Sequence, residues 1–379
     1  MIPREEYRER QERARVRMRA LELQALVVVS GPFYERPGDV AYLSGHLPPF
    51  PTSETEPPFA GTGYAAALLD HRELVLLVDT PRYRSDRVVA DEVRVSVDLW
   101  GTLVEVLRGR AAWEVGVVGT DVAPVEMARR LEEAGFRMVP ADGLLRSLRR
   151  CKSAAEVDLL RRAVACAREG LVAACTACIP GASEQEVCAT GVAAALRAGA
   201  DFVRYLRVHS GPWSAWTTRW PPATDRKLIK SDLVLLDLVG AREGYHFDVL
   251  RTTLVGFDPL PWQRALLEAT QRALARALRT IRPGVPVREV VAAALGAYEE
   301  AGLGEHAATL LGHGIGLETV EAPYLRPESE TRLEEGMVLC VEPSVCLPGQ
   351  GGACIEEEVV VTREGCEVLT SGIPRLLWE

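Results

Sequence analysis

The first part of the chain alternates short apolar runs with charged stretches that have helical spacing. The apolar runs read LQALVVVS, VAYLSG, YAAALLD, ELVLLVDT, VRVSVDLW and EVGVVG. This alternation predicts an α/β domain built around a central sheet. Residues 1–20 are dense in Arg and Glu and predict an exposed amphipathic helix, whereas residues 47–58, rich in Pro, Ser and Thr, predict a loop.

The pattern changes near residues 144–152. The segment LRRCKSAAEVDLLRRAVACAREGLVAAC places apolar residues three and four positions apart, as on a helix. We place a domain boundary just before this segment, so that residues 1–147 form one domain and residues 148–379 form the other. A chain of 379 residues supports two domains, since a single core stops growing near about 250–300 residues.

The second domain begins with helices and ends with strands. Ser183 followed by Glu186 makes a capping box that predicts the start of a second helix. The runs FVRYLRVHSG, LVLLDLV and YHFDVLRTTLV have the character of strands, and two long helices are expected at residues 261–281 and 286–301. Together with the late strands MVLCVE and CIEEEVVV, this order predicts an α+β domain with helices over one face of an antiparallel sheet.

Composition narrows the classes of function. The net charge of −9 is spread without long single-sign blocks, which argues against a nucleic-acid partner. No apolar run reaches the roughly 18 residues of a membrane span, so we expect a cytoplasmic protein without a membrane partner. The nine cysteines indicate reduced, mostly buried thiols, and the CxxC of Cys175 and Cys178 has no second pair to complete a zinc site.

Five residues carry the chemistry that the pattern indicates. Asp237 stands in the apolar run LVLLDLV, and Asp248 follows on the next predicted strand after a Gly-containing turn, so a hairpin brings both carboxylates to one face. Glu342 and Glu356 repeat the pattern of an acid within a β-branched run. His313 lies between glycines in LGHGIG, which allow close approach of the backbone.

A carboxylate in an apolar strand is costly without a compensating cation. Four carboxylates and one imidazole suit hard or borderline divalent ions, with Mn²⁺, Co²⁺ and Zn²⁺ as candidates. Because carboxylates can bridge, two ions about 3.5–4 Å apart are feasible and would share a hydroxide nucleophile. Each residue taken singly also fits a structural role, but the set as a whole favours a metal centre. Periodicity alone leaves Glu358 open as a ligand, since it faces the same side as Glu356.

The sequence resembles the pita-bread metallopeptidases, which include prolidase, aminopeptidase P and methionine aminopeptidase, together with the related creatinases. LRRCKSAAEVDLLRRA is similar to the family's first helix of the catalytic domain, and DLVGAREGYHFDVLRTT is similar to its two-aspartate hairpin. LGHGIGLETVEAP, GMVLCVEPSV and GGACIEEEVVVT resemble its His, Glu and Glu segments, and VAYLSG is similar to the prolidase N-terminal domain. The resemblance implies a creatinase-like N-terminal domain, a pita-bread catalytic domain and a homodimer, and it selects Glu356 over Glu357 and Glu358.

The chain departs from the family pattern at three positions. Val320 stands where prolidase-like members usually carry a His before the Glu of TVEAP, and Trp220 stands at our best placement of a second family His. Those imidazoles hydrogen-bond the substrate carbonyl and the tetrahedral intermediate, and losing one such donor typically costs a factor of about 10²–10³ in rate. Cys354 replaces an Arg that relatives often have.

Other residues could complete the site. Glu321, His209 and His246 are the candidate catalytic residues, with either histidine as a replacement for a missing imidazole. The tryptophans of the segment before LVLLDLV form, with Val320, a candidate substrate pocket whose aromatic wall would bind a cationic or apolar substrate. A buried aromatic patch or a subunit contact is the structural alternative. The three tryptophans are Trp213, Trp216 and Trp220.

The leading hypothesis is a metal-dependent hydrolase that resembles Xaa-Pro dipeptidase and aminopeptidase P. In it, a hydroxide activated by two metal ions attacks a peptide or amide bond of a small substrate. The alternative keeps the fold and the metals but changes the reaction, as in a small-molecule hydrolase or lyase similar to ectoine hydrolase or dimethylsulfoniopropionate lyase. A scaffold that only binds is disfavoured because all five ligands are retained.

Overall fold

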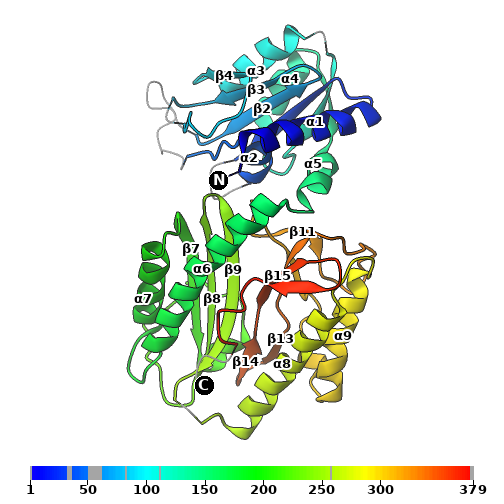
Figure 1. The fold of residues 1–379 in the computed structure, drawn as a ribbon. Coiled ribbons are helices and arrows are strands. Elements are labelled where there is room, and N and C mark those ends of the chain that lie inside the picture. The colour runs from blue at the N-terminus through cyan, green and yellow to red at the C-terminus, as the bar shows by residue number, and fades with distance from the viewer. Residues whose placement is uncertain are drawn as a thin grey trace. The chain divides into compact units, whose positions relative to one another are not determined.

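The computed structural model describes residues 2–31, 36–49, 62–81, 83–110, 112–256 and 258–375. The chain divides into two compact units, Met1–Arg149 and Arg150–Glu379 (Figure 1). Most of the loop expected at residues 47–58 lies outside the described residues. In the part of the chain that is described, no helix combines the length and the apolar character needed to cross a membrane.

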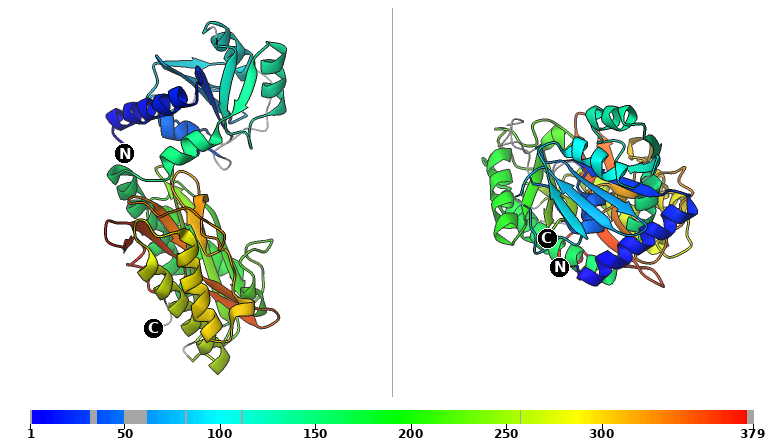
Figure 2. Two further views of the ribbon diagram at one scale, coloured as in Figure 1. Left: turned by 90° about the vertical axis from the view of Figure 1, so that its right-hand side faces the viewer. Right: turned by 90° about the horizontal axis from the view of Figure 1, so that it is seen from above.

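The first unit is an α/β domain with one mixed sheet, as the alternating pattern predicts. Its strand order is β4-β3-β2-β1-β5-β6, in which β1 pairs antiparallel with β2 and parallel with β5. The helices α3 and α4 pack on one face of this sheet through a continuous apolar core (Figure 2). The elements of this unit are α1 (Arg4–Ala20), β1 (Ala25–Ser30), α2 (Gly38–Ser44), β2 (Ala65–Asp70), β3 (Leu74–Val78), β4 (Glu92–Val95), α3 (Leu99–Arg108), β5 (Glu114–Val118), α4 (Val125–Glu133), β6 (Arg137–Pro140) and α5 (Asp142–Arg149).

The alternating pattern suggested that the run VAYLSG is a strand of this sheet. In the structure this run instead forms most of the helix α2. Pro37 precedes the helix, and Gly45 ends it in the left-handed conformation with φ of 73°. A side chain at Gly45 would also overlap neighbouring atoms, including the carbonyl oxygen of Arg87. Every residue from Val40 to Ser44 is buried. A short apolar run that is buried on all sides has no periodicity to separate helix from strand, so its flanking residues decide.

The described part of the second unit contains three antiparallel sheets, of which the two larger each carry a pair of helices and the third is the two-stranded sheet β13-β14. The helices α6 and α7 pack on the sheet β7-β8-β9, and α8 and α9 pack on the sheet β11-β10-β12-β15-β16 (Figure 1). The sequence predicted helices over one antiparallel sheet, whereas the structure has helices over two of them, each with a separate core. The elements are α6 (Ala154–Ala177), α7 (Glu184–Arg197), β7 (Phe202–Ser210), β8 (Leu233–Arg242), β9 (Tyr245–Leu254), α8 (Pro261–Thr280), α9 (Val287–Glu300), β10 (Gly312–Gly314), β11 (Glu321–Tyr324), β12 (Val338–Val341), β13 (Ser344–Leu347), β14 (Gly351–Cys354), β15 (Glu357–Val361) and β16 (Cys366–Val368), with short 3₁₀ turns at Gly211–Ala215 and Gly304–His306.

Local signals in the sequence set the boundaries of these elements. Ser153 and Ser183 each accept a hydrogen bond from the backbone of a glutamate three residues on, which completes capping boxes at the starts of α6 and α7. Between β8 and β9, Glu243 and Gly244 both have positive φ, 52° and 81°. A two-residue turn of this kind matches the twist of a hairpin and fixes its register.

Candidate metal centre

The two aspartates lie on neighbouring strands and face the same side of the sheet. Asp237 pairs with Leu250, and Asp248 pairs with Val239, so the two acids are offset by two residues across the β8–β9 hairpin. Since side chains alternate with a period of two, an offset of two places both on one face. Both side chains are buried.

The imidazole of His313 is held with one nitrogen turned toward the acids. Its Nδ1 lies 3.0 Å from the carbonyl oxygen of Gly314, which can only accept a hydrogen bond. Nδ1 therefore carries the proton, and the lone pair of Nε2 lies 3.8 Å from Asp248 Oδ2 and 3.6 Å from Glu342 Oε1. Burial lowers the pKa of His313, which keeps the ring neutral.

The strand that carries His313 approaches its neighbour too closely for a side chain at the preceding position. Gly312 has φ of 142°, and a Cβ there would overlap the carbonyl oxygen of Cys340 on β12. A Cβ at Gly314 would lie 2.6 Å from the carbonyl oxygen of Ala322. The glycines of LGHGIG thus permit the close backbone approach that the sequence predicts.

The sequence suggested that the two glutamates lie within strands. In the structure they lie at the ends of strands. Glu342 directly follows β12, and Glu356 directly precedes β15. The backbone nitrogen of Glu356 donates to the carbonyl oxygen of Leu250 at 3.0 Å, which fixes this turn against β9. Glu356 Oε1 is buried without a hydrogen-bond partner among the described residues.

These side chains converge. Oxygens of Asp237, Asp248 and Glu356 lie within 4.8 Å of one another, beside the His313–Glu342 pair. Burial raises the pKa of Asp237 to about 7, with a further rise from Asp248, and burial also raises the pKa of Glu342 to about 8. Burial raises the pKa of Glu356 well above its usual range.

Such crowding of buried carboxyl groups is unfavourable unless cations neutralise them. Oxygens with one neutral imidazole are also the donors that hard and borderline divalent ions prefer. The unpaired Glu356 Oε1 and the free Nε2 lone pair therefore fit a divalent ion in chemistry and in direction.

The two acids that follow Glu356 have other partners. Glu358 Oε1 accepts the backbone N–H of Asp248 at 2.9 Å. Glu357 pairs with the buried Arg251 at 3.1 Å and with Arg375 at 2.7 Å. Of the three consecutive glutamates, Glu356 is the one whose carboxylate groups with the two aspartates.

Comparison with known proteins decides the family. Residues 158–363 match metallopeptidase family M24, and residues 10–151 match the creatinase/prolidase N-terminal domain. The chain belongs to metallopeptidase family M24.

Similar proteins cover almost the whole chain. A probable dipeptidase PepE of Mycobacterium tuberculosis is 33% identical over 329 residues, which cover 86% of each chain. The Xaa-Pro dipeptidase of Pyrococcus furiosus is 29% identical over 350 residues, which are 91% of this chain and 94% of that one. The crystal structure of the prolidase from Pyrococcus horikoshii superposes with a TM-score of 0.85 at 25% identity and covers 97% of this chain and 99% of that one.

These likenesses confirm the resemblance that the sequence motifs carried. The dipeptidase PepE from Mycobacterium ulcerans, also a solved structure, matches with a TM-score of 0.83 at 30% identity over 99% of each chain. The protein has the two-domain pita-bread fold and is a metal-dependent hydrolase. Divalent metal ions are the cofactor class of its family.

Glu321 lies on β11 and forms a buried ion pair. Its Oε2 lies 3.4 Å from Lys152 Nζ, and its Oε1 accepts the backbone N–H of Glu318 at 2.9 Å. Lys152 directly precedes the Ser153 cap of α6, so this pair connects the start of that helix to the segment after His313.

The two candidate histidines are both buried. His209 has Nδ1 2.7 Å from the carbonyl oxygen of Trp216, and its Nε2 has no hydrogen-bond partner among the described residues. His246 lies on β9 two residues before Asp248, and its ring contacts Phe202 edge-on at 6.0 Å between centroids.

The candidate pocket residues are exposed. Trp220 is 89% exposed, Val320 is 42% exposed, and Trp213 and Trp216 are each 48% exposed. The face of Trp213 is already in contact with a cation, because the guanidinium carbon of Arg219 lies 5.2 Å from the ring centroid. The exposed indoles are therefore not the buried aromatic patch of the structural alternative.

Sequence reasoning missed Arg207. This residue lies on β7 opposite Asp237, and its Nη1 donates to Asp237 Oδ2 at 2.6 Å. In the sequence it stands in FVRYLRVHSG, two residues before His209 on the same strand face, and nothing in that run indicates a contact with Asp237. Cys340 was also missed, and its thiol lies within 4.8 Å of donor atoms of His313 and Glu356.

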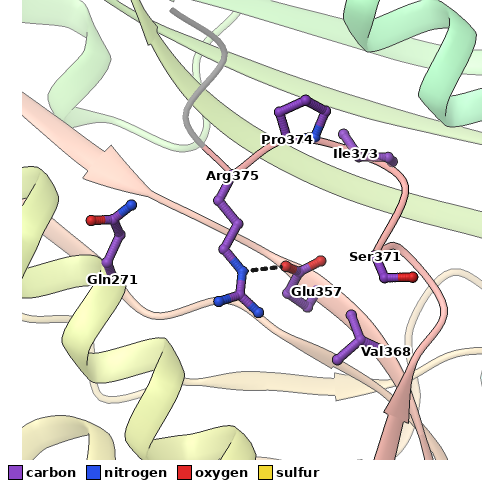
Figure 3. Close-up of a pocket in the computed structure, with 7 residues that line it drawn as sticks. All are labelled: Gln271, Glu357, Val368, Ser371, Ile373, Pro374 and Arg375. Carbon is purple, nitrogen blue, oxygen red and sulfur yellow. Dashed lines mark hydrogen bonds and ion pairs between the residues drawn. The ribbon is translucent and has the colours of Figure 1, made fainter. Parts of the chain in front are cut away.

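A separate cavity of about 460 Å³ opens near the C-terminal end of the described chain (Figure 3). Its charged groups, Glu357 and Arg375, bind each other across the opening. It contains none of the five converging residues. Its lining consists of Gln271, Glu357, Val368, Ser371, Ile373, Pro374 and Arg375.

Proposed function

We propose that this chain is a dipeptidase that holds two divalent metal ions on five side chains and hydrolyses a peptide bond in a small substrate. The observation that carries the proposal is the convergence of four acids and one neutral imidazole in a buried site. The proposed ions are Mn²⁺, Co²⁺ or Zn²⁺, which accept this mixture of oxygen and nitrogen donors. The proposed ligands are Asp237, Asp248, His313, Glu342 and Glu356.

Divalent ions bound there would polarise the scissile carbonyl and lower the pKa of water, so that a nucleophile forms near neutral pH. The chain's own groups prepare the site for this. Gly314 holds the His313 ring in the tautomer whose Nε2 lone pair faces the acids. Glu358 fixes the backbone at Asp248, and Leu250 fixes the backbone at Glu356.

The proposed substrate class is a dipeptide without a strong preference for proline. The relatives are named as a probable dipeptidase and as an Xaa-Pro dipeptidase. At the two positions where we place the family's substrate-binding imidazoles, this chain has Val320 and Trp220. A valine side chain cannot donate a hydrogen bond, and the indole of Trp220 is largely exposed to solvent.

The resemblance to the family also supports a cytoplasmic homodimer. The three exposed tryptophans, Trp213, Trp216 and Trp220, either contact substrate or contact a second copy of the chain. Chromatography with light scattering on the wild type and on Trp220→Ala would separate these roles. A change in molar mass supports the subunit contact, and a change in KM alone supports the substrate contact.

The test of the proposed function is hydrolysis of a dipeptide panel by metal-depleted enzyme supplied with Mn²⁺, Co²⁺ or Zn²⁺ in turn. Mass spectrometry of the released amino acids would measure the turnover. The panel should include Xaa-Pro, Xaa-Ala and Xaa-Leu dipeptides together with acylated amides. Metal-dependent release from at least one dipeptide is expected. No release from any dipeptide with any of the three ions would overturn the proposal.

A further inference from the structure

One buried carboxylate joins the two ends of the loop that carries the three exposed tryptophans. This tryptophan loop comprises residues 211–226, in the connection between β7 and β8. Glu184, the first residue of α7, is 0% exposed. Its Oε1 accepts the backbone N–H of Ser210 at 2.9 Å and the hydroxyl of Ser210 at 2.7 Å. Its Oε2 accepts the backbone N–H of Thr224 at 3.0 Å and the hydroxyl of Thr224 at 2.6 Å.

The same carboxylate also holds the middle of the tryptophan loop. Arg219 Nη2 donates to Glu184 Oε2 at 2.6 Å, and the guanidinium carbon of Arg219 lies 5.2 Å from the ring centroid of Trp213. Burial alone would raise the pKa of this carboxyl group, but the hydrogen bonds from Thr224, Ser210 and Arg219 lower it. The group is therefore charged at neutral pH and accepts charge-assisted hydrogen bonds from both ends and the middle of the loop.

The tryptophan loop is bound to two segments that lead to proposed metal ligands. His209 is on β7, and its Nδ1 donates to the carbonyl oxygen of Trp216 at 2.7 Å. The backbone N–H of Gly352 on β14 donates to Ser214 Oγ at 3.2 Å, and β14 ends two residues before Glu356. A Cβ at Gly352 would lie 2.8 Å from the carbonyl oxygen of Ser214, so the loop packs directly on that strand.

The indoles of the loop are held in an exposed position. Trp213 and Trp216 are each 48% exposed, and Trp220 is 89% exposed. Exposed aromatic rings are unfavourable in water, and a mobile loop would be free to turn them inward. A ring that is fixed in one orientation loses little entropy when it binds an apolar group, which favours binding. The hydrogen bonds to Glu184 therefore suit a loop whose indoles contact a ligand.

We infer that Glu184 is a positioning residue that holds the tryptophan loop beside the metal centre, so that Trp216 contacts an apolar side chain of the bound dipeptide. This inference rests on the proposed function, because the dipeptide is its substrate. It assigns Trp216 to a substrate contact and not to a subunit contact. Trp216 is chosen because its carbonyl is bound to the sheet that carries two of the proposed ligands.

The experiment compares wild type, Glu184→Gln and Trp216→Ala on Leu-Leu, Gly-Leu and Leu-Gly, with saturating Mn²⁺. Glu184→Gln retains one acceptor oxygen, so only one end of the loop stays held. In both variants KM for Leu-Leu should rise about three- to tenfold, the value of one aromatic contact. One of the two glycine dipeptides lacks the contacted side chain, and its KM should stay within about twofold. Values of kcat should stay within about twofold throughout.

Two further variants complete the comparison. Glu186→Gln is the matched control, because it makes the same charge change on the same helix at an exposed carboxylate that binds Lys227. A glutamine also completes the capping box at Ser183, so this variant should keep every KM. Thr224→Val removes only one hydroxyl donor to Glu184 and covers the case in which Glu184→Gln fails to fold. It should raise KM for Leu-Leu by about two- to threefold with the same selectivity.

Fluorescence and calorimetry separate positioning from a general structural role. Quenching of tryptophan fluorescence by acrylamide should increase in Glu184→Gln and stay at the wild-type value in Glu186→Gln. Calorimetric titration of metal-depleted Glu184→Gln with Mn²⁺ should match wild type within about twofold in affinity. Weaker metal binding in Glu184→Gln would instead show that the residue supports the whole unit, and would overturn the inference.

Equal changes of KM for all three dipeptides, or no change in Glu184→Gln and Trp216→Ala, would overturn the inference alone. A lower molar mass of Trp216→Ala without a selective rise in KM would also overturn it, since Trp216 would then belong to a subunit contact. No metal-dependent release from any dipeptide by wild type would overturn the proposed function and the inference together.

Discussion

The carboxylate of Glu358 accepts a hydrogen bond from the backbone N–H of Asp248, and the two atoms are 2.9 Å apart. The bond joins β15 to β9, which belong to different sheets of the second unit. It places the segment that carries Glu356 against the strand that carries Asp248. The geometry of the candidate metal centre therefore depends on a residue that is not itself one of the proposed ligands.

Replacing Glu358 with Ala should destabilise the enzyme by about 1–3 kcal/mol, because the buried N–H of Asp248 loses its acceptor. Glu358→Gln retains an acceptor oxygen and should lose less stability than Glu358→Ala. Urea denaturation of both variants with bound metal measures the difference. Equal stability of Glu358→Ala and wild type would show that the hydrogen bond does not hold the two sheets together.

Removal of a proposed ligand should abolish turnover while the fold remains. Asp248→Ala and Glu342→Ala each remove a donor, and with it both Lewis acidity and the activated nucleophile. Turnover of the best dipeptide of the panel, with circular dichroism as a check on folding, measures the effect. Glu367→Ala is the matched control, since it removes a surface carboxylate and should keep full activity. Full turnover in a metal-free sample would rule out this mechanism.

The stability of the metal-free enzyme should fall as the pH rises from about 5 to about 8. In the folded protein the pKa of Asp248 is raised to about 7 and that of Glu342 to about 8, mainly by burial. Unfolded carboxyl groups titrate near about 4, so the folded state holds extra protons between these values. Their contribution to stability is complete below about pH 4 and is lost as the pH rises through about 7–8.

Bound metal should remove this dependence, because it replaces the protons on the carboxyl groups. Thermal unfolding across the pH range, with and without saturating Mn²⁺, tests the prediction. Calorimetry in two buffers of different ionisation enthalpy should show protons released on binding at pH 6. A metal-free enzyme whose stability rises over the same range would contradict the assignment of raised pKa values.

Xaa-Pro dipeptides should be cleaved slowly or not at all. Val320 and Trp220 stand where we place two imidazoles of the family, and each missing donor costs a factor of about 10²–10³ in rate. Val320→His and Trp220→His should therefore raise any residual activity on Xaa-Pro, and the gains need not be additive because both act on one intermediate.

The alternative is that His209 or His246 already fills one of these roles. Assays of wild type, His209→Ala and His246→Ala separate the cases. Wild-type turnover of Xaa-Pro near the enzyme median of about 10 s⁻¹, retained in both alanine variants, would refute the claim that the missing histidines disable the reaction.

The sequence by itself determined the elements whose signals are local. The capping serines Ser153 and Ser183 begin α6 and α7, and positive φ at Glu243 and Gly244 makes the hairpin that pairs the aspartates. Such features depend on a few neighbouring residues, so they can be read without knowing the rest of the fold. The family motifs then added the resemblance that the comparisons confirm.

Only the tertiary structure decided the features that depend on distant segments. The apolar run of α2 is buried on all sides by α1, β1 and β2, and this burial removes the period that would have separated helix from strand. Periodicity gave Glu356 and Glu358 the same face, but packing against β9 turned one toward the aspartates and the other to the backbone of Asp248. Arg207 meets Asp237 only because β7 pairs with β8 in one register, and strand pairing across 30 residues leaves no local signal.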